Sequence, residues 1–215
     1  MNLYLIRHGQ SYVNLKDWDV TGKSPDQGLT ELGIKQAQAL VKWLPTHLPH
    51  LDVLYSSTMQ RALETAEFVA KGYANCSLQF DDRLREVTNN YCDHTAIADN
   101  DLPRTYSEYW STERPYSNIT LDNPNVETWM HFRTRVSMFV QDMITKHQEQ
   151  TVVVVCHGGV IEAVLAHAFN IGIWQRCEVW THNTGITHFE YLGKQPSSFW
   201  RLHYHSWTKH LDFEF

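Results

Sequence analysis

The sequence predicts an α/β fold in which helices cover both faces of a mostly parallel central sheet, a three-layer α/β/α sandwich. Short apolar runs of strand length alternate along the chain with longer segments of helical periodicity, which is typical of such sheets. One run, residues 151–155, consists only of threonine and valine. Because a β-branched run without polar alternation is typical of a strand covered on both faces, we expect it at the centre of the sheet.

Strands are expected wherever these short apolar runs occur. A turn formed by Asn183, Thr184 and Gly185 is expected to lead into the last of them and to touch the ligand pocket if it lies close enough. The predicted strands span residues 3–6, 53–55, 151–156 and 186–191.

Helices are expected where apolar residues recur at three- and four-residue spacing. Thr30 is placed to cap the first helix. Ser57 and Gln60 fit a capping box for the second helix, which would set Arg61 in its first or second turn. The apolar stripes that predict the helices lie within residues 37–44, 62–70, 129–143 and 160–169.

The chain is expected to form a single domain over residues 1–215. A length of 215 residues with 42% apolar and 13% aromatic content is enough to bury one core. Residues 88–126 lack periodicity and are rich in Asn, Asp, Pro, Tyr and Trp, so we expect a long, lid-like excursion over the sheet. Its aromatic side chains either line a hydrophobic substrate pocket or pin the loop to the core; they are Tyr106, Tyr109, Trp110 and Tyr116.

Composition argues against several kinds of partner. The formal charge of -6, without a run of Lys and Arg, disfavours a general nucleic-acid or membrane-surface binder, because such partners are held by clustered positive charge. No apolar stretch approaches the roughly 20 residues that span a bilayer. Met1 leads directly into a strand-like run, so we expect a cytoplasmic protein, either a monomer or a homodimer. The scattered cysteines, which we expect to be reduced, are Cys76, Cys92, Cys156 and Cys177.

The first candidate site residues follow the opening strand. Arg7, His8 and Gly9 come directly after its apolar run, and Asn14 lies a few residues further on. Ligands of open α/β sheets bind beyond the carboxyl ends of the strands, which is where these residues fall. A neutral imidazole can attack phosphorus and become a phosphohistidine, which divides one transfer into two easier steps. We therefore interpret His8 as a candidate nucleophile.

A second candidate group follows the central strand. His157, Gly158 and Gly159 end that strand and open a helix. If the strands before His8 and His157 are parallel neighbours, both imidazoles project from the same edge of the sheet and can face each other. The backbone N–H groups of the two glycines, close to a helix N-terminus, would favour an anion there.

Arg7 and Arg61 are expected to form a guanidinium clamp for phosphate oxygens. Phosphoryl transfer depends mainly on positioning and on compensation of charge on the phosphoryl oxygens, so two arginines with a protonated His157 could replace a metal ion. We therefore expect neither a metal nor a cofactor. Three histidines near the end of the chain are interpreted as incidental surface residues on a terminal strand without a nearby carboxylate; they are His203, His205 and His210.

Hydrolysis also needs an acid for the leaving oxygen and then a base for water. Glu86 is the candidate, because it begins the irregular excursion and could reach the pocket from above. Three other carboxylates nearby in the sequence remain alternatives: Glu64, Asp81 and Asp82.

Taken together, these segments resemble the histidine phosphatase superfamily, which has the phosphoglycerate mutase-like fold. The motifs occur in the family order from the start of the chain to about Ala168. They are Leu5-Ile6-Arg7-His8-Gly9-Gln10-Ser11, Gly28-Leu29-Thr30-Glu31-Leu32-Gly33, Tyr55-Ser56-Ser57 through Arg61-Ala62, Leu84-Arg85-Glu86 and Val155-Cys156-His157-Gly158-Gly159. The resemblance implies that His8 is the phosphorylated nucleophile and that Glu86 is the proton donor. It also implies that the phosphoryl group is held by Arg7, Arg61 and His157, and that Asn14 lies at the pocket.

The resemblance leaves more than one reaction open. In the mutases of this family the acid begins a Glu-Arg-x-Tyr-Gly segment, whereas Glu86 is followed by Val87-Thr88-Asn89-Asn90-Tyr91, and the Gly-x-x-Glu-Gly pattern of many phosphatase branches is missing too. We predict a phosphatase that acts on a small phosphorylated metabolite. The alternatives are a cofactor-dependent phosphoglycerate mutase and a catalytically inactive domain that binds a phosphorylated partner.

Overall fold

The computed structural model describes residues 1–16, 24–74, 76–104, 115–120, 123–173, 178–193 and 197–211. Within these residues a sheet is formed by the strands β1 (Asn2–Arg7), β2 (Val53–Ser56), β3 (Leu78–Phe80), β4 (Thr151–Cys156), β5 (Ile186–Leu192) and β6 (Phe199–Trp207). Their spatial order is β3-β2-β4-β1-β5-β6. Pairing is parallel from β3 through β1 and antiparallel for β5 and β6, so the sheet is mixed and mostly parallel.

The α-helices of the described residues are α1 (Glu31–His47), α2 (Gln60–Lys71), α3 (Trp129–Lys146) and α4 (Gly158–Ala168). The predicted cap of α1 is confirmed, because the hydroxyl of Thr30 accepts a hydrogen bond from the N–H of Gly33 at 3.1 Å. The predicted capping box of α2 is wrong. The N–H of Gln60 donates instead to the two carboxylate oxygens of Asp26, at 2.9 and 3.1 Å, and the hydroxyl of Ser57 faces a histidine.

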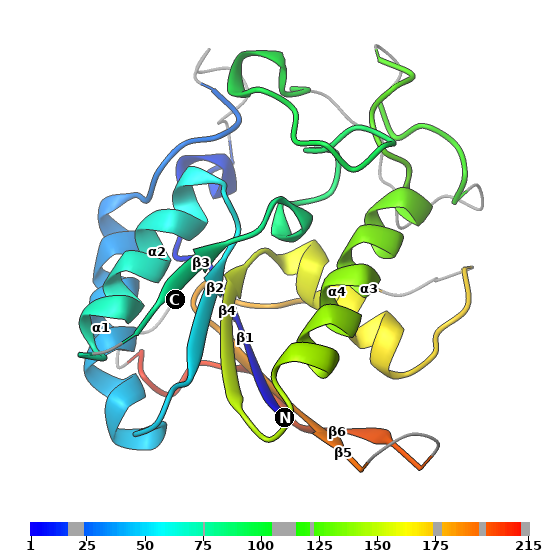
Figure 1. Cartoon of the computed structure of the whole chain (residues 1–215). Coiled ribbons are helices and arrows are strands. Elements are labelled where there is room, and N and C mark those ends of the chain that lie inside the picture. Colours follow the sequence, from blue (N-terminus) through cyan, green and yellow to red (C-terminus); the bar gives the residue numbers. More distant parts are fainter. Residues whose placement is uncertain are drawn as a thin grey trace.

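β4 lies inside the sheet between β2 and β1, as its uninterrupted apolar sequence predicts. Its side chains alternate between two cores, since Val152 and Val154 pack with α3 and α4, whereas Val153 and Val155 pack with α1 and α2. Figure 1 shows the two helix pairs on opposite faces of the sheet. The predicted three-layer sandwich is therefore confirmed.

Residues 88–126 contain no α-helix and no strand of the sheet in their described parts, as expected from the lack of periodicity. Figure 1 places these parts beyond the carboxyl ends of the parallel strands. The side chain of Tyr116 is 67% exposed, so it neither pins the loop to the core nor lines a buried pocket. The other aromatics of the prediction, Tyr106, Tyr109 and Trp110, lie outside the described residues.

The histidines near the end of the chain differ from the prediction. His203 and His205 lie on β6, but His203 has a carboxylate partner, because its Nε2 lies 2.9 Å from Glu190 Oε2. His210 lies beyond the strand and is buried, with its Nε2 2.9 Å from the hydroxyl of Thr184. The alternation of residues along one strand could not predict these hydrogen-bond partners, because Glu190 lies on the neighbouring strand and Thr184 in the turn before it.

Two further findings concern the helices and the cysteines of the described residues. None of the described helices has both the length and the apolar character needed to cross a membrane. Three cysteines are free thiols, namely Cys76, Cys92 and Cys156, and Cys177 lies outside the described residues.

The loop after β1 packs directly on the first turn of α1 through two glycines. A Cβ added to Gly9 would lie 2.7 Å from the carbonyl oxygen of Gly33, and a Cβ added to Gly33 would overlap the carbonyl oxygen of Gln10. Neither backbone atom can move aside as a flexible side chain could. The contact between loop and helix therefore requires residues without a Cβ.

We expect Gly33→Ala to lower the free energy of unfolding by about 1–3 kcal/mol, because the added methyl group forces the loop and the helix apart. Urea denaturation monitored by circular dichroism measures the change. Gly172→Ala is the matched control, since no atom lies within 4 Å of its added Cβ. Equal stability of the two variants would contradict the role assigned to this contact.

Candidate active site

The pairing of β1 with β4 brings two histidines together that are far apart in the sequence. The two strands are parallel and Arg7 pairs with Cys156, so the residues that follow, His8 and His157, leave the sheet side by side. The N–H of His8 donates to the carbonyl of Cys156 at 2.9 Å. The imidazole centroids lie 5.1 Å apart with the rings inclined at 60°, and both side chains are buried.

The ring of His8 has a defined orientation. Its Nδ1 lies 2.7 Å from the carbonyl oxygen of Gly9, which can only accept, so Nδ1 carries the hydrogen. Nε2 therefore presents a lone pair, and the Nε–H of Arg61 donates to it at 3.1 Å. Burial, and then the charges of Arg61 and Arg7, lower the pKa of His8 well below its ordinary value. His8 is thus a neutral imidazole with one nitrogen available.

The ring of His157 lies beside that of His8. Its Nε2 is 2.8 Å from the hydroxyl oxygen of Ser57, and that oxygen accepts the N–H of Met59 at 3.3 Å. The hydroxyl proton can therefore be donated to Nε2, and in that tautomer the ring carries its hydrogen on Nδ1. Burial, followed by Arg61, His8 and Arg7, lowers the pKa of His157 well below its ordinary value. In the unliganded site, burial and the arginines therefore disfavour the protonated His157 that the sequence analysis expects.

Two arginines approach the site from different elements. Arg61 lies in the first turn of α2, is buried, and places its Nη1 3.6 Å from Asp26 Oδ1. Arg7 ends β1; its Nη1 donates to the carbonyl of Thr181, and its guanidinium carbon lies 5.5 Å from the centre of the Trp180 ring. Asp26 both caps α2 and holds Arg61, so it fixes the guanidinium relative to its own helix.

Glu86 faces the same site from the segment after β3. Its Oε1 accepts the N–H of Val87 at 2.9 Å, and its Oε2 accepts the N–H of Gly159 at 3.1 Å, at the start of α4. The three alternative carboxylates have other partners. Leu29 N donates to Glu64, Arg83 pairs with Asp81, and the hydroxyl of Thr58 donates to Asp82.

These groups surround a cavity of about 280 Å³. Six of the seven predicted site residues line it, and they are Arg7, His8, Asn14, Arg61, Glu86 and Gly158. His157 is not among the lining residues; its side chain is completely buried, and its ring lies beside that of His8. Gly159, whose N–H the sequence also indicated, lines it too, and the lining residues that the sequence did not indicate are Val13, Val87, Glu162, Glu178, Val179, Trp180 and Thr181.

The signals for the missed residues differ. Glu162 lies one helical turn after Gly158, so helical spacing from the Gly-Gly pair could have found it. Residues 178–181 belong to no helix or strand and precede the turn into β5, where no local pattern marks them. The predicted turn itself does reach the site, since Asn183 Nδ2 donates to the carbonyl of His8 at 3.0 Å.

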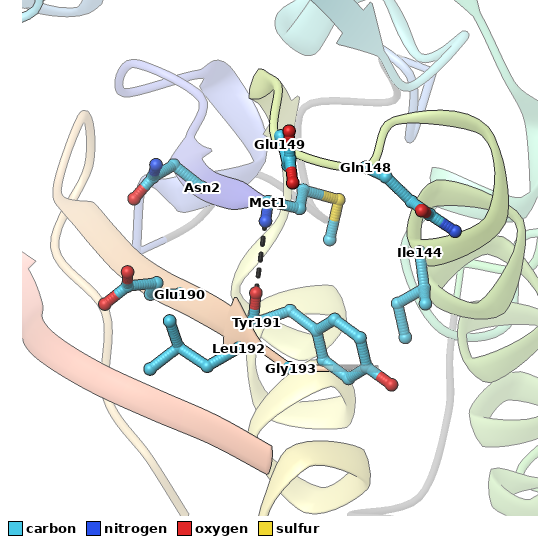
Figure 2. A pocket seen from close by; sticks show the side chains of 9 residues that line it. All are labelled: Met1, Asn2, Ile144, Gln148, Glu149, Glu190, Tyr191, Leu192 and Gly193. Atoms are coloured by element: carbon cyan, nitrogen blue, oxygen red, sulfur yellow. Dashed lines mark hydrogen bonds between the residues drawn. The ribbon is translucent and has the colours of Figure 1, made fainter. Parts of the chain in front are cut away.

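A larger cavity, of about 660 Å³, lies at the other end of β1. Figure 2 shows its lining side chains, among them Met1, Ile144 and Tyr191, with the amino group of Met1 donating to the carbonyl of Tyr191 at 3.1 Å. Its described lining holds no histidine and no arginine. Size therefore does not identify the functional site here, and the chemistry of the lining residues does.

The smaller cavity has the character of a phosphoryl site. Two guanidinium groups, a neutral imidazole whose lone pair accepts a hydrogen bond from Arg61, and the carboxyl group of Glu86 converge on it. Guanidinium groups match the oxygens of a phosphoryl group in geometry and in charge. In the part of the chain that the structure describes, no three His, Cys, Asp or Glu side chains are grouped as they would be around a metal ion.

Comparison with known proteins agrees with this class of site. The sequence matches the family model of the histidine phosphatase superfamily (branch 1) over residues 3–202. The chain therefore belongs to the histidine phosphatase superfamily. The prediction of a histidine phosphatase, a phosphoric monoester hydrolase, is confirmed at this level.

Individual relatives have low sequence identity to this chain, but the similarity extends over most of its length. A protein of Hydrogenobacter thermophilus named for phosphoserine phosphatase activity is 27% identical over 204 residues, covering 91% of this chain and 92% of its own length. The 2,3-bisphosphoglycerate-dependent phosphoglycerate mutase of Bartonella henselae is 31% identical over 165 residues, with coverage of 76% and 79%. The structure of Bacillus stearothermophilus YhfR superposes with a TM-score of 0.71 at 25% identity, over 97% of this chain and 98% of that one.

The lowered pKa of His8 makes a prediction for stability. In the unfolded chain a histidine binds a proton as the pH falls through about 6.5, whereas the folded protein does not bind it until a lower pH. The unfolded state therefore gains protons first, and the free energy of unfolding decreases below about pH 6.5 by up to ~1.4 kcal/mol per pH unit for this residue. We expect His8→Asn to flatten this decrease in urea titrations at pH 7, 6 and 5.

His50→Asn serves as the control for loss of an exposed histidine, since the side chain of His50 is 77% exposed and its ion-pair partner, Asp52, lies away from the site. This variant should flatten the decrease less than His8→Asn does. If His8→Asn keeps the full decrease, the neutral state assigned to His8 is incorrect.

Proposed function

We propose that this protein hydrolyses a small phosphomonoester through a phosphohistidine on Nε2 of His8. The observation that carries the proposal is the orientation of this ring. Nδ1 is held by the carbonyl of Gly9, so the lone pair of Nε2 is directed to the guanidinium of Arg61 in the cavity. A phosphoryl group bound by Arg61 would meet this lone pair directly.

The first step exchanges one hydrogen bond for another and then forms a covalent bond. The Nε–H of Arg61 leaves the imidazole and donates to a phosphoryl oxygen, while Arg7 compensates the remaining charge. Nε2 of His8 attacks phosphorus, and the bond from phosphorus to the leaving oxygen breaks. Protonated Glu86 gives its proton to that oxygen, and the Nδ1–H of His157 donates to the transferred group.

The second step returns the enzyme to its starting state. The carboxylate of Glu86 takes a proton from a water molecule, whose oxygen attacks phosphorus. The bond between phosphorus and Nε2 breaks, which releases inorganic phosphate and neutral His8. Because the arginines compensate the phosphoryl charge, no metal ion enters either step.

Hydrolysis is favoured over the mutase reaction by the rest of the cavity. A mutase must hold a second anionic group of its substrate, which requires cations away from the phosphoryl centre. Among the described lining residues the arginines are Arg7 and Arg61, which serve that centre, whereas Glu162 and Glu178 are carboxylates. Support for a small metabolite as substrate comes from the cavity volume and from the relative named for phosphoserine phosphatase activity.

We expect His8→Ala to lose turnover by roughly 10⁴-fold or more and to form no phosphoenzyme, because the attacking nitrogen is removed. Release of inorganic phosphate from p-nitrophenyl phosphate measures turnover, and ³¹P NMR of acid-sensitive, base-stable phosphoprotein detects the intermediate. His50→Ala is the control. Full activity in His8→Ala would remove the mechanism, and binding of phosphate without turnover in the unmodified protein would favour an inactive binding domain.

We expect Glu86→Gln to separate substrates by their leaving group. An aryl oxide such as p-nitrophenolate leaves without protonation, so the first burst of p-nitrophenol is retained, whereas phosphoenzyme formation from an alkyl phosphate falls about 10²–10⁴-fold. Rapid-quench kinetics with both substrates measures the two rates. Glu67→Gln, an exposed glutamate of α2, should change neither. Equal losses with both substrates would assign the proton to another group.

A further inference from the structure

We propose that Arg135 is a positioning residue that holds Glu86 in place from behind the pocket. Arg135 lies on α3, and its guanidinium is completely buried. Its Nη1 donates to the carbonyls of Arg83 and Arg85, at 2.7 and 2.8 Å, and its Nη2 donates to the carbonyl of Glu86 at 3.0 Å. These three acceptors belong to the short segment that carries the proposed acid, so this inference rests on the proposed function.

The same guanidinium is neutralised by a second buried residue. Glu127 accepts from Nε of Arg135 at 2.7 Å and from Nη2 at 2.6 Å, and both side chains are 0% exposed. A guanidinium has five N–H donors. Two are directed to Glu127 and three to the backbone around Glu86, so the fork has no donor left for any other partner.

The segment that Arg135 holds has no regular secondary structure of its own. Residues 85–88 lie between the 3-10 turn Asp82–Leu84 and an irregular stretch, so no helix or sheet ladder fixes their backbone. Thr88, two residues after the acid, has a φ of 70°, a conformation that costs a β-branched residue about 1–3 kcal/mol and persists only where the surroundings impose it. The N–H of Glu127 also donates to the carbonyl of Asn90 at 3.1 Å, which ties the far side of this stretch to the pair.

The chemistry of the pair fits positioning better than it fits stability. A buried ion pair adds little stability compared with apolar residues of similar volume. It does supply rigid donors without net charge, so the carbonyls near Glu86 are held in place without an uncompensated buried cation. A displacement of about 1 Å in a catalytic group can cost about 10²-fold in rate. The pair of Arg135 and Glu127, termed the Arg135–Glu127 clamp, prevents such a displacement of Glu86.

The test uses the leaving group as its readout. We expect Arg135→Lys to lower the rate of phosphoenzyme formation from an alkyl phosphate by about 10²-fold, since an ammonium cannot reproduce the five-donor fork. With p-nitrophenyl phosphate, which needs no acid, the burst rate should change less than about threefold. A purely structural role would lower both rates together with the folded fraction, which circular dichroism reports.

Two further variants keep the test decisive. Arg133→Lys is the matched control, because Arg133 lies on the same helix and donates to the carbonyls of Ile171 and Gly172, away from Glu86. It should show no difference between the substrates. If Arg135→Lys does not fold, the double variant Arg135→Met/Glu127→Met removes the clamp without leaving a buried charge, and it should show the same selective loss.

The outcomes separate this inference from the proposed function. Selective loss with alkyl substrates in Glu86→Gln and in the clamp variants supports both. Selective loss in Glu86→Gln alone overturns the positioning role of Arg135 and leaves the acid in place. No selectivity in Glu86→Gln refutes the acid assignment itself. Failure of both clamp variants to fold would also overturn the inference, because the pair would then act through stability.

Discussion

The parallel pairing of β1 with β4 is the constraint on which the site depends. Because Arg7 and Cys156 are paired in register, the next residue of each strand leaves the sheet at the same level, and the imidazoles of His8 and His157 meet at 5.1 Å. A shift of one residue would turn one ring to the other face of the sheet. The hydrogen bond from the N–H of His8 to the carbonyl of Cys156, at 2.9 Å, belongs to the observed register and would be lost in such a shift.

The electrostatics of the site follow from its crowding. Two guanidinium groups lie near two imidazoles in a buried place, and the lowest free energy leaves the imidazoles neutral. The positive charge is therefore carried by groups that cannot lose it, and Nε2 of His8 keeps its lone pair. Hydrogen bonds of opposite sense, one to the carbonyl of Gly9 and one to the hydroxyl of Ser57, give each ring its own orientation.

Much of the fold and most of the site could be predicted from the sequence, because the signals are local. Apolar patterns located β1, β2, β4, β5 and the four α-helices, and Arg7, His8 and Arg61 stand at the ends of these elements, where a parallel sheet collects side chains. The strand β3, which precedes Glu86, was not predicted, because its three residues form no recognisable apolar run. The capping of α2 by Asp26 could not be predicted, since the two residues that it joins are 34 apart and no spacing rule links them.

The remaining errors have a similar cause. The charge of His157 depends on the number of cations that the fold brings together, which is a property of the assembled site and not of any motif. The five hydrogen bonds of Arg135 include three to backbone carbonyls 49 to 52 residues away. A carbonyl acceptor leaves no mark in a sequence, so a helix arginine that binds three of them looks like any other.

The hydrogen bond from Arg61 to His8 gives the unliganded site a built-in competitor. The imidazole accepts the N–H of Arg61 that an incoming anion needs, so an anion binds only by replacing this hydrogen bond. The affinity of the site for the anion therefore depends on how much more strongly Arg61 binds the anion than the imidazole. A carboxylate offers a single negative charge and two oxygens, which compensate this exchange less well than the three oxygens of a phosphomonoester dianion do. The unliganded site thus disfavours the binding of singly charged carboxylic acids, because each of them must displace His8 from Arg61.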